Sequence, residues 1–196
     1  MSEVNNVKAV LETYAAQCRI GAKPAKPDFD FRGADLAGGN YAGADLVGIN
    51  FSSADFSGAD LECANLAFAE LAFAKLEGAR LTRANLEAAN LDYSKSERAN
   101  FERANCARAT FFRARCAAAN FSGIVGTRAN FHGADLEDAN FPLTNLTEAN
   151  MECAFFACAK FFDAILTGAS FTGAEQLDLA EFDGAVDAHM LRSKLR

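Results

Sequence analysis

Several residue types that often mark catalytic or membrane proteins are scarce in this sequence. It has no tryptophan, three prolines and two histidines, His132 and His189. No run of about 18 apolar residues occurs, so no membrane-spanning helix is expected. The N-terminus lacks a basic segment followed by an apolar core, which argues against a secretory signal. A soluble, cytoplasmic protein is therefore predicted.

Positive charge is also in deficit. Lysine and arginine number 19 against 26 aspartates and glutamates, which gives a formal net charge of -7. This balance disfavours nonspecific attraction to nucleic-acid phosphates or to an anionic membrane surface. Neither direct nucleic-acid binding nor membrane association is expected.

What the chain does have is a five-residue period that runs without insertion or deletion from Phe29 to Gly173. The centre of each unit, every fifth residue from Phe31 to Phe171, is Leu or Phe in 23 of 29 units, and the residue two places earlier is Ala in 23. Helices repeat every 3.6 residues and flat strands every 2. A period of five fits a short strand followed by a corner, with Ala and Leu/Phe inward and Asp or Asn outward. Four corners predict a closed coil of about 20 residues.

The units match the A(D/N)LXX motif at Ala34-Asp35-Leu36, Ala44-Asp45-Leu46, Ala84-Asn85-Leu86 and Ala129-Asn130-Phe131. The chain thereby resembles the pentapeptide-repeat family over nearly three quarters of its length. The resemblance implies an all-β, right-handed quadrilateral β-helix, here of about seven coils. It implies no particular activity, because the family includes proteins of unassigned role and a few protein-binding regulators.

Residues 1–27 break the pattern and predict an amphipathic helix with a spacer. Ser2 is a plausible N-cap, Gly21 is placed to end the helix, and Ala22 to Pro27 should be extended. Apolar residues recur at helical spacing, namely Val4, Val7, Leu11, Tyr14 and Cys18. We expect this helix to cover the first coil, although its apolar stripe would also suit a partner.

Residues 28–173 form the predicted β-helix, and residues 174–196 a partly helical C-terminal cap and tail. The cap residues are Leu177, Leu179, Phe182, Val186 and Met190, which would equally suit a homodimer interface. The tail from Leu191 to Arg196 should fray. Both a monomer and a homodimer joined through a terminal cap fit this pattern.

Two further features of the repeat, its glycines and one interrupted unit, have structural explanations. Ten glycines lie at the second residue after a centre, where a type II corner requires a positive φ. The stretch from Gly123 to Thr127 loses both its Ala and its apolar centre. Either the rod bends there, or Ile124 fills the space that Gly126 leaves, and we favour the second interpretation.

No convergent catalytic or metal site is evident. His132 is predicted to face outward and His189 lies in the tail, so each should simply be solvated. The repeated Asp residues follow from the motif, and the glycines are corner residues rather than a phosphate loop. None of the six cysteines shares a face with another one coil away, and no C-x-x-C pair occurs. No enzyme activity, cofactor, metal or disulfide is expected.

The candidate site is therefore a surface. Phe73 and Tyr93 occupy one corner position one coil apart, Arg113 follows in that column, and Phe112 lies beside it. Such an apolar and cationic column has the composition of a binding hot spot. Aromatic rings that merely shield the corner backbone are the plainer alternative. Four further arginines complete the candidate partner surface, namely Arg83, Arg103, Arg108 and Arg128.

Charge is banded along the predicted rod. Residues 28–62 hold seven acidic residues and one basic, residues 98–128 hold six arginines and one glutamate, and residues 129–163 hold six acidic residues and one lysine. The leading hypothesis is a noncatalytic, rigid module that binds a protein partner. The alternative, taken from family members that resemble DNA, is a mimic that binds DNA gyrase or topoisomerase. Motif-driven Asp residues alone would also produce acidic ends.

Overall fold

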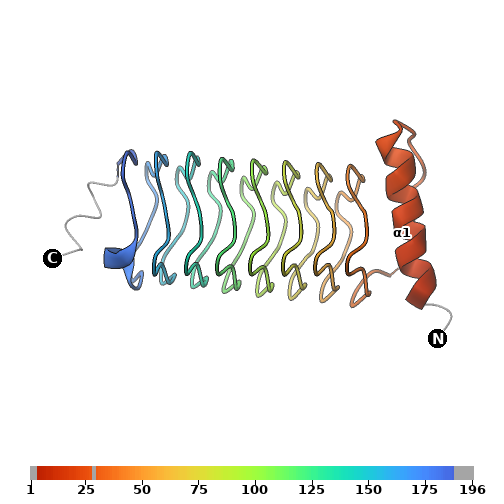
Figure 1. Ribbon diagram of the computed structural model, residues 1–196, viewed down its shortest axis with the longest axis horizontal. Coiled ribbons are helices and arrows are strands. Elements are labelled where there is room, and N and C mark those ends of the chain that lie inside the picture. Colours follow the sequence, from red (N-terminus) through yellow and green to blue (C-terminus); the bar gives the residue numbers. More distant parts are fainter. Residues whose placement is uncertain (1–3, 28–29, 188–196) are drawn as a thin grey trace.

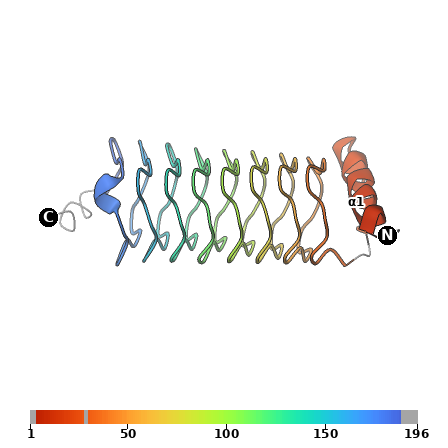
Figure 2. The ribbon, with the colours of Figure 1, turned by 60° about the horizontal axis from the view of Figure 1, so that its bottom comes forward.

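The computed structural model describes residues 4–27 and 30–187, and they form a rod. Figure 1 shows flat coils stacked along the long axis, with helix α1 (Val4–Arg19) across one end. A short 3-10 helix, η1 (Leu177–Leu179), lies near the other end. The same stacking is evident after the rod is turned about its axis (Figure 2).

Neighbouring coils are joined by parallel bridges of one residue each. From Asp35↔Asp55 to Phe155↔Glu175, every bridge joins residues 20 positions apart. One coil therefore takes 20 residues, as the five-residue period predicts. Residues that differ by 20 in number lie in the same column, one coil apart.

The unit from Asp55 to Ala59 illustrates why the backbone can close such short coils. One of its five N–H groups donates to the preceding coil, two donate to the following coil, one closes the corner turn, and one bonds to the Asp55 side chain. In chain order the acceptors are Ala34 O at 2.9 Å, Lys75 O at 2.7 Å, Asp55 Oδ1 at 3.0 Å, Glu77 O at 2.9 Å and Phe56 O at 2.9 Å. Asp or Asn before a centre thus accepts a donor that would otherwise be unpaired.

Every corner residue from 33 to 173 has a positive φ. The residue before it does not, and the following N–H bonds back across the turn, which is the arrangement of a type II turn. Glycine adopts this conformation without strain, whereas other residues lose about 1–2 kcal/mol. The predicted role of the corner glycines is confirmed, and many corners carry larger residues in the same conformation.

The repeat centres fill the interior. All of them from Phe31 to Phe171 are buried, including the small centres Ser96, Cys106, Cys116 and Gly126. Phenyl rings in one column stack nearly parallel, with centroids 4.9 Å apart for Phe101–Phe121 and 4.7 Å for Phe121–Phe141. This confirms the predicted assignment of centres to the core.

The irregular unit from Gly123 to Thr127 is repacked and the ladder is continuous. Bridges join Val125 to Asn105 on one side and to Asn145 on the other. Ile124 is buried, and a Cβ at Gly126 would lie 3.3 Å from Ile124 Cδ1 and 2.9 Å from Leu146 Cδ2. Ile124 therefore occupies the space beside Gly126, as the favoured interpretation expects.

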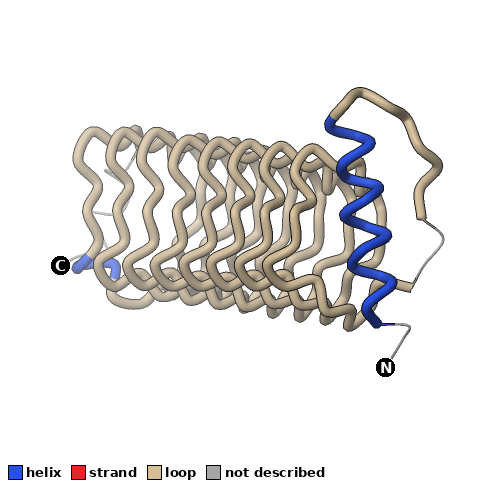
Figure 3. Tube along the Cα trace, turned by 45° about the vertical axis from the view of Figure 1, so that its right-hand side comes forward, coloured by secondary structure: helices blue, strands red, loops and turns tan. Residues whose placement is uncertain are grey.

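Helix α1 lies across the first coil, as Figure 3 shows. Leu11, Tyr14 and Ala15 are buried against the core, and the Tyr14 hydroxyl donates a hydrogen bond to Asp45 O at 2.9 Å. This places the apolar stripe of the helix against the coil. The suggested N-cap, Ser2, lies outside the described residues.

The coils continue past residue 173, where the sequence suggests that the repeat fades. The last bridges, Lys160↔Glu181 and Ile165↔Val186, span 21 residues, because one extra residue enters at η1. Phe182 consequently stacks on Phe161, with centroids 4.9 Å apart and an interplanar angle of 5°. Met190 and the tail from 191 to 196 lie outside the described residues, as does His189.

Candidate interaction surface

Four ring side chains form a continuous cluster at one corner of the rod. We call Phe73, Tyr93, Phe112 and His132 the aromatic edge. Phe73 and Tyr93 stack with centroids 5.0 Å apart and an interplanar angle of 3°, and Phe112 meets Tyr93 edge-on at 5.5 Å. His132 stacks on Phe112 at 5.5 Å. The first two rings remain 58% and 40% exposed, so the edge faces solvent.

Arg113 extends the aromatic edge and gives it a positive charge. Its guanidinium carbon lies 5.2 Å from the centroid of the Phe112 ring, within the range of a cation–π interaction. Arg113 is exposed, and its Cγ lies over the corner at Gly133 in the next coil. The predicted column of Phe73, Tyr93 and Arg113, with Phe112 beside it, is thus brought together.

A ladder of basic residues runs next to this column. Bridges join Lys75 to Lys95 and Lys95 to Arg115, and all three side chains are exposed. Lys75 Nζ lies 2.8 Å from Asp55 Oδ2, and Arg115 Nη2 lies 2.8 Å from Glu97 Oε1. Within residues 4–27 and 30–187, neither Lys95 nor Arg113 has an acidic partner in ion-pair range. These two cations are available to a ligand.

The other four predicted arginines lie elsewhere. Arg83 and Arg103 share a second corner column, and Arg108 and Arg128 share a third. Arg108 pairs with Glu87, while Arg128 Nε lies 2.6 Å from Glu148 Oε2. Arg108 and Arg128 border a groove of about 300 Å³. The predicted set therefore divides among three corners, and only its aromatic members with Arg113 form one cluster.

The predicted arginines lie at different corners because of their spacing in the sequence. Arg98, Arg103, Arg108 and Arg113 are successive corner residues, so a single coil carries an arginine at each of its four corners. Residues five apart point from different corners, whereas residues 20 apart stack. Closeness in sequence within the arginine band does not produce closeness in space.

Residues of the surface that the sequence analysis missed follow the same rule. His132 lies 20 positions after Phe112 and stacks on it, so the prediction that it is simply solvated is wrong. Lys75, Lys95 and Arg115 also follow one another at 20-residue intervals. The coil length would have identified both sets, had it been applied to every outward column.

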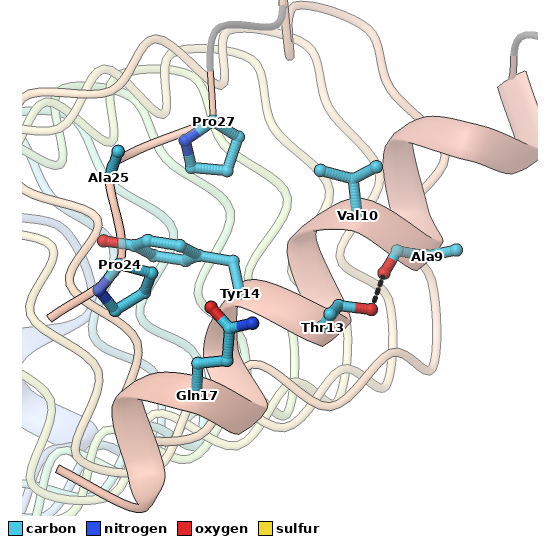
Figure 4. Close-up of a pocket in the computed structure, with 8 residues that line it drawn as sticks. All are labelled: Ala9, Val10, Thr13, Tyr14, Gln17, Pro24, Ala25 and Pro27. Atoms are coloured by element: carbon cyan, nitrogen blue, oxygen red, sulfur yellow. Dashed lines mark hydrogen bonds between the residues drawn. The ribbon is translucent and has the colours of Figure 1, made fainter. Parts of the chain in front are cut away.

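A second depression lies between α1 and the spacer that follows it (Figure 4). It has a volume of about 420 Å³ and a mainly apolar lining that includes Val10, Tyr14, Pro24 and Pro27. The Thr13 hydroxyl donates to Ala9 O at 2.8 Å, and the Tyr14 hydroxyl is bonded to Asp45 O. Its hydroxyl groups thus serve the cap itself, and the groove offers little polar recognition.

The described part of the chain contains no group of three or more His, Cys, Asp or Glu side chains placed to hold a metal ion. All six cysteines are free thiols. Burial raises the pKa of the Cys106 thiol to about 12 and also raises the pKa of Cys116, so both stay protonated and inert. Among the described helices, none has the length and apolar character needed to cross a bilayer.

Coils of 20 residues joined by parallel bridges define a solenoid, a repeat protein in which each coil contacts only its neighbours. The model of the pentapeptide repeats matches in 8 copies over residues 30–66, 64–103, 104–141, 127–161 and 143–175, and the chain belongs to this family. No curated protein sequence matches the chain.

Solved structures with the same fold include two trypsin-treated forms of QnrB1, described as a plasmid-mediated fluoroquinolone resistance protein. One has a TM-score of 0.59 at 17% identity, over 80% of this chain and 82% of that one. The other has a TM-score of 0.54 at 15% identity, over 87% and 92%. HetL, a pentapeptide-repeat protein from the cyanobacterium Nostoc, matches over 78% and 84% at 24% identity, but its TM-score is 0.27. The QnrB1 matches support the right-handed β-helix.

Proposed function

We propose that this protein is a noncatalytic interaction module that binds a protein partner through the aromatic edge and Arg113. The observation that carries the proposal is the exposure of a stacked ring pair, Phe73 and Tyr93, on a rigid corner. Large aromatic side chains beside arginine are the residues that contribute most to protein–protein binding. Their positions are fixed by the coils, so little ordering entropy is lost on binding.

The backbone gives no reason for these residues. Phe73, Tyr93 and Arg113 have φ values of 60°, 57° and 51°, in the region that glycine adopts most easily. The same corner carries Gly33 and Gly133 in other coils, and a Cβ at Gly33 would meet nothing within 4 Å. Non-glycine residues at many other corners have the same positive φ. What distinguishes this corner is a stacked ring pair that does not fill the core and stays exposed to solvent, which supports partner binding.

Affinity capture from native lysate tests the proposal. Phe73→Ser combined with Tyr93→Ser should reduce capture of a specific partner at least about tenfold, a loss of about 1.4 kcal/mol. Phe68→Ser is the matched control, because Phe68 is 58% exposed and has a φ of 59° on a different corner. Capture that survives in the double variant, or falls equally in the control, would remove the aromatic edge as the binding site.

A second candidate function, mimicry of DNA toward a type II topoisomerase, is motivated by the acidic first coils and the fold shared with QnrB1. Stacked Asp35 and Asp55 imitate successive phosphates in this hypothesis. Much of that charge is neutralised within the chain, since Asp55 pairs with Lys75 and Asp60 with Arg80. The aromatic edge therefore supports the first function better.

Supercoiling by bacterial gyrases, assayed at low salt, distinguishes the two candidates. DNA mimicry predicts inhibition at micromolar protein that weakens as salt screens the acidic columns. Binding of a different protein partner through the aromatic edge predicts no inhibition of gyrase. Inhibition that persists in the Phe73→Ser and Tyr93→Ser variant would favour mimicry through the acidic faces.

A further inference from the structure

We propose that the aromatic edge, together with Lys95 and Arg113, binds an extended acidic segment of the partner protein in which carboxylates alternate with apolar residues. The inference rests on the proposed function and specifies the chemistry of the partner. Three features support it, namely the charge left unpaired, the orientation of the rings and the geometry of the two columns.

The unpaired charge of the surface is positive although the protein as a whole is acidic. Lys95 and Arg113 lack acidic partners in the described part of the chain, and so does Arg98 at the next corner. The nearby carboxylate of Asp92 accepts the backbone N–H of Phe112 at 3.0 Å and is half-buried. Carboxylates of a partner would form ion pairs with these cations and make the two surfaces electrostatically complementary.

The rings favour a protein segment over a nucleic acid. Bases bind proteins by stacking on open ring faces. Here Tyr93 covers one face of Phe73, and Phe112 stacks on His132 with the guanidinium carbon of Arg113 5.2 Å from its ring centroid. The ring faces engaged in these contacts are not free for a base, whereas the exposed parts of Phe73 and Tyr93 suit aliphatic or aromatic side chains. The net charge of -7 further opposes a polyanion as long as DNA or RNA.

The geometry favours an extended segment that lies along the rod. The column of Phe73, Tyr93 and Arg113 runs parallel to the ladder of Lys75, Lys95 and Arg115, and both repeat at one residue per coil. An extended chain directs successive side chains to opposite sides and rises about 3.3 Å per residue. A segment placed between the two columns would direct apolar side chains toward the rings and carboxylates toward the lysines. Two coil steps of about 4.8 Å accommodate only a short motif.

Fluorescence anisotropy with the full chain tests this inference. The probe is a fluorescein-labelled peptide of about ten residues in which glutamate alternates with leucine, enough to span the columns at about 3.3 Å per residue. Wild-type protein should bind it, with affinity that falls as salt rises, and should not bind the lysine–leucine counterpart. Lys95→Glu with Arg113→Glu should weaken binding at least about tenfold.

The matched control reverses two arginines on another corner, Arg83→Glu with Arg103→Glu, and should change affinity less than about twofold. Equal weakening in both pairs would overturn the inference, because it would show nonspecific attraction. Tighter binding of a labelled single-stranded oligonucleotide would overturn it in favour of nucleic acid. If the charge-reversal pair does not fold, Lys95→Ala with Phe73→Ser replaces it, with the same tenfold expectation.

The outcomes separate this inference from the proposed function. Loss of lysate capture in the Phe73→Ser and Tyr93→Ser variant, with no binding of the acidic peptide by wild type, would retain the interaction module and discard the acidic partner. Binding of the peptide with lysate capture intact in the double variant would discard the aromatic edge as the site of the captured partner.

Discussion

At the scale of single residues, each five-residue unit assigns a different task to each position. The centre fills the interior, and the preceding Asp or Asn accepts the N–H two residues later, as Asn50 does for Ser52 at 2.9 Å. The corner residue turns the chain with a positive φ. Because the corner side chain points away from the core, its identity is open to selection for binding.

Phe121→Ala tests the role of the centres. Phe121 is fully buried and contacts four other phenyl rings, so its truncation should lower the free energy of unfolding by about 3–5 kcal/mol. The exposed control Glu137→Ala should cost less than about 0.5 kcal/mol. Chemical denaturation measures both, and similar losses would contradict the division into inward and outward positions.

Thiol reactivity tests burial independently. Cys63, Cys153 and Cys158 are exposed and should react with a thiol reagent at pH 8 in the native protein. Cys106 and Cys116 should react only on unfolding, because burial both blocks access and raises their pKa, to about 12 for Cys106. A raised pKa keeps a thiol protonated as the pH rises toward that value. Rapid native modification of Cys106 would contradict the described packing.

At the scale of elements, each coil is stabilised by contacts with its neighbouring coils alone. The first and last coils therefore need another segment to cover their outer faces. Helix α1 supplies this at the N-terminal end through Leu11, Tyr14 and Ala15. The Tyr14 hydroxyl donates a hydrogen bond to Asp45 O, and burial raises its pKa to about 12, so it keeps this proton above the pH at which an exposed tyrosine ionises. The helix is therefore fixed to the first coil by both packing and polar contacts.

Leu11→Ala should lower the free energy of unfolding by about 2–5 kcal/mol, because it opens a cavity between α1 and the first coil. In a solenoid the effect should be local, with faster amide hydrogen exchange at Leu36 and Tyr41 than at Phe121. The exposed Gln17→Ala serves as the control. Equal acceleration in all coils would mean that the rod unfolds as one unit and that α1 is not a local cover.

Much of this fold follows from periodicity, because a five-residue repeat leaves the backbone few alternatives. A single extra residue is inserted near Gln176, which has a φ of 51°, and it shifts the register by one. A sequence pattern with a fixed period of five therefore does not reveal the coil that continues to Val186. The stacking of Phe73 on Tyr93 follows from the 20-residue coil. The salt bridges that leave Lys95 and Arg113 unpaired do not, since they depend on side-chain torsion angles.

At the scale of the whole molecule, stability and the proposed binding function depend on different residues. Columns of buried centres stabilise the coils, while corner columns present side chains at a spacing set by the ladder. The aromatic edge belongs to the second group, so the fold should tolerate its removal. This independence distinguishes a binding surface from a folding element, because a surface required for folding would need no partner to explain it.

The midpoint of thermal unfolding of the Phe73→Ser and Tyr93→Ser variant, followed by far-UV circular dichroism, shows whether stability is independent of the aromatic edge. A stability change of about 1 kcal/mol shifts the midpoint by about 2–4 °C for a chain of this size. Loss of one exposed ring stack, worth about 0.5–1.5 kcal/mol, should therefore lower it by only a few degrees. A decrease as large as that caused by Phe121→Ala would show that the edge is part of the stabilising core and would contradict its independence from the fold.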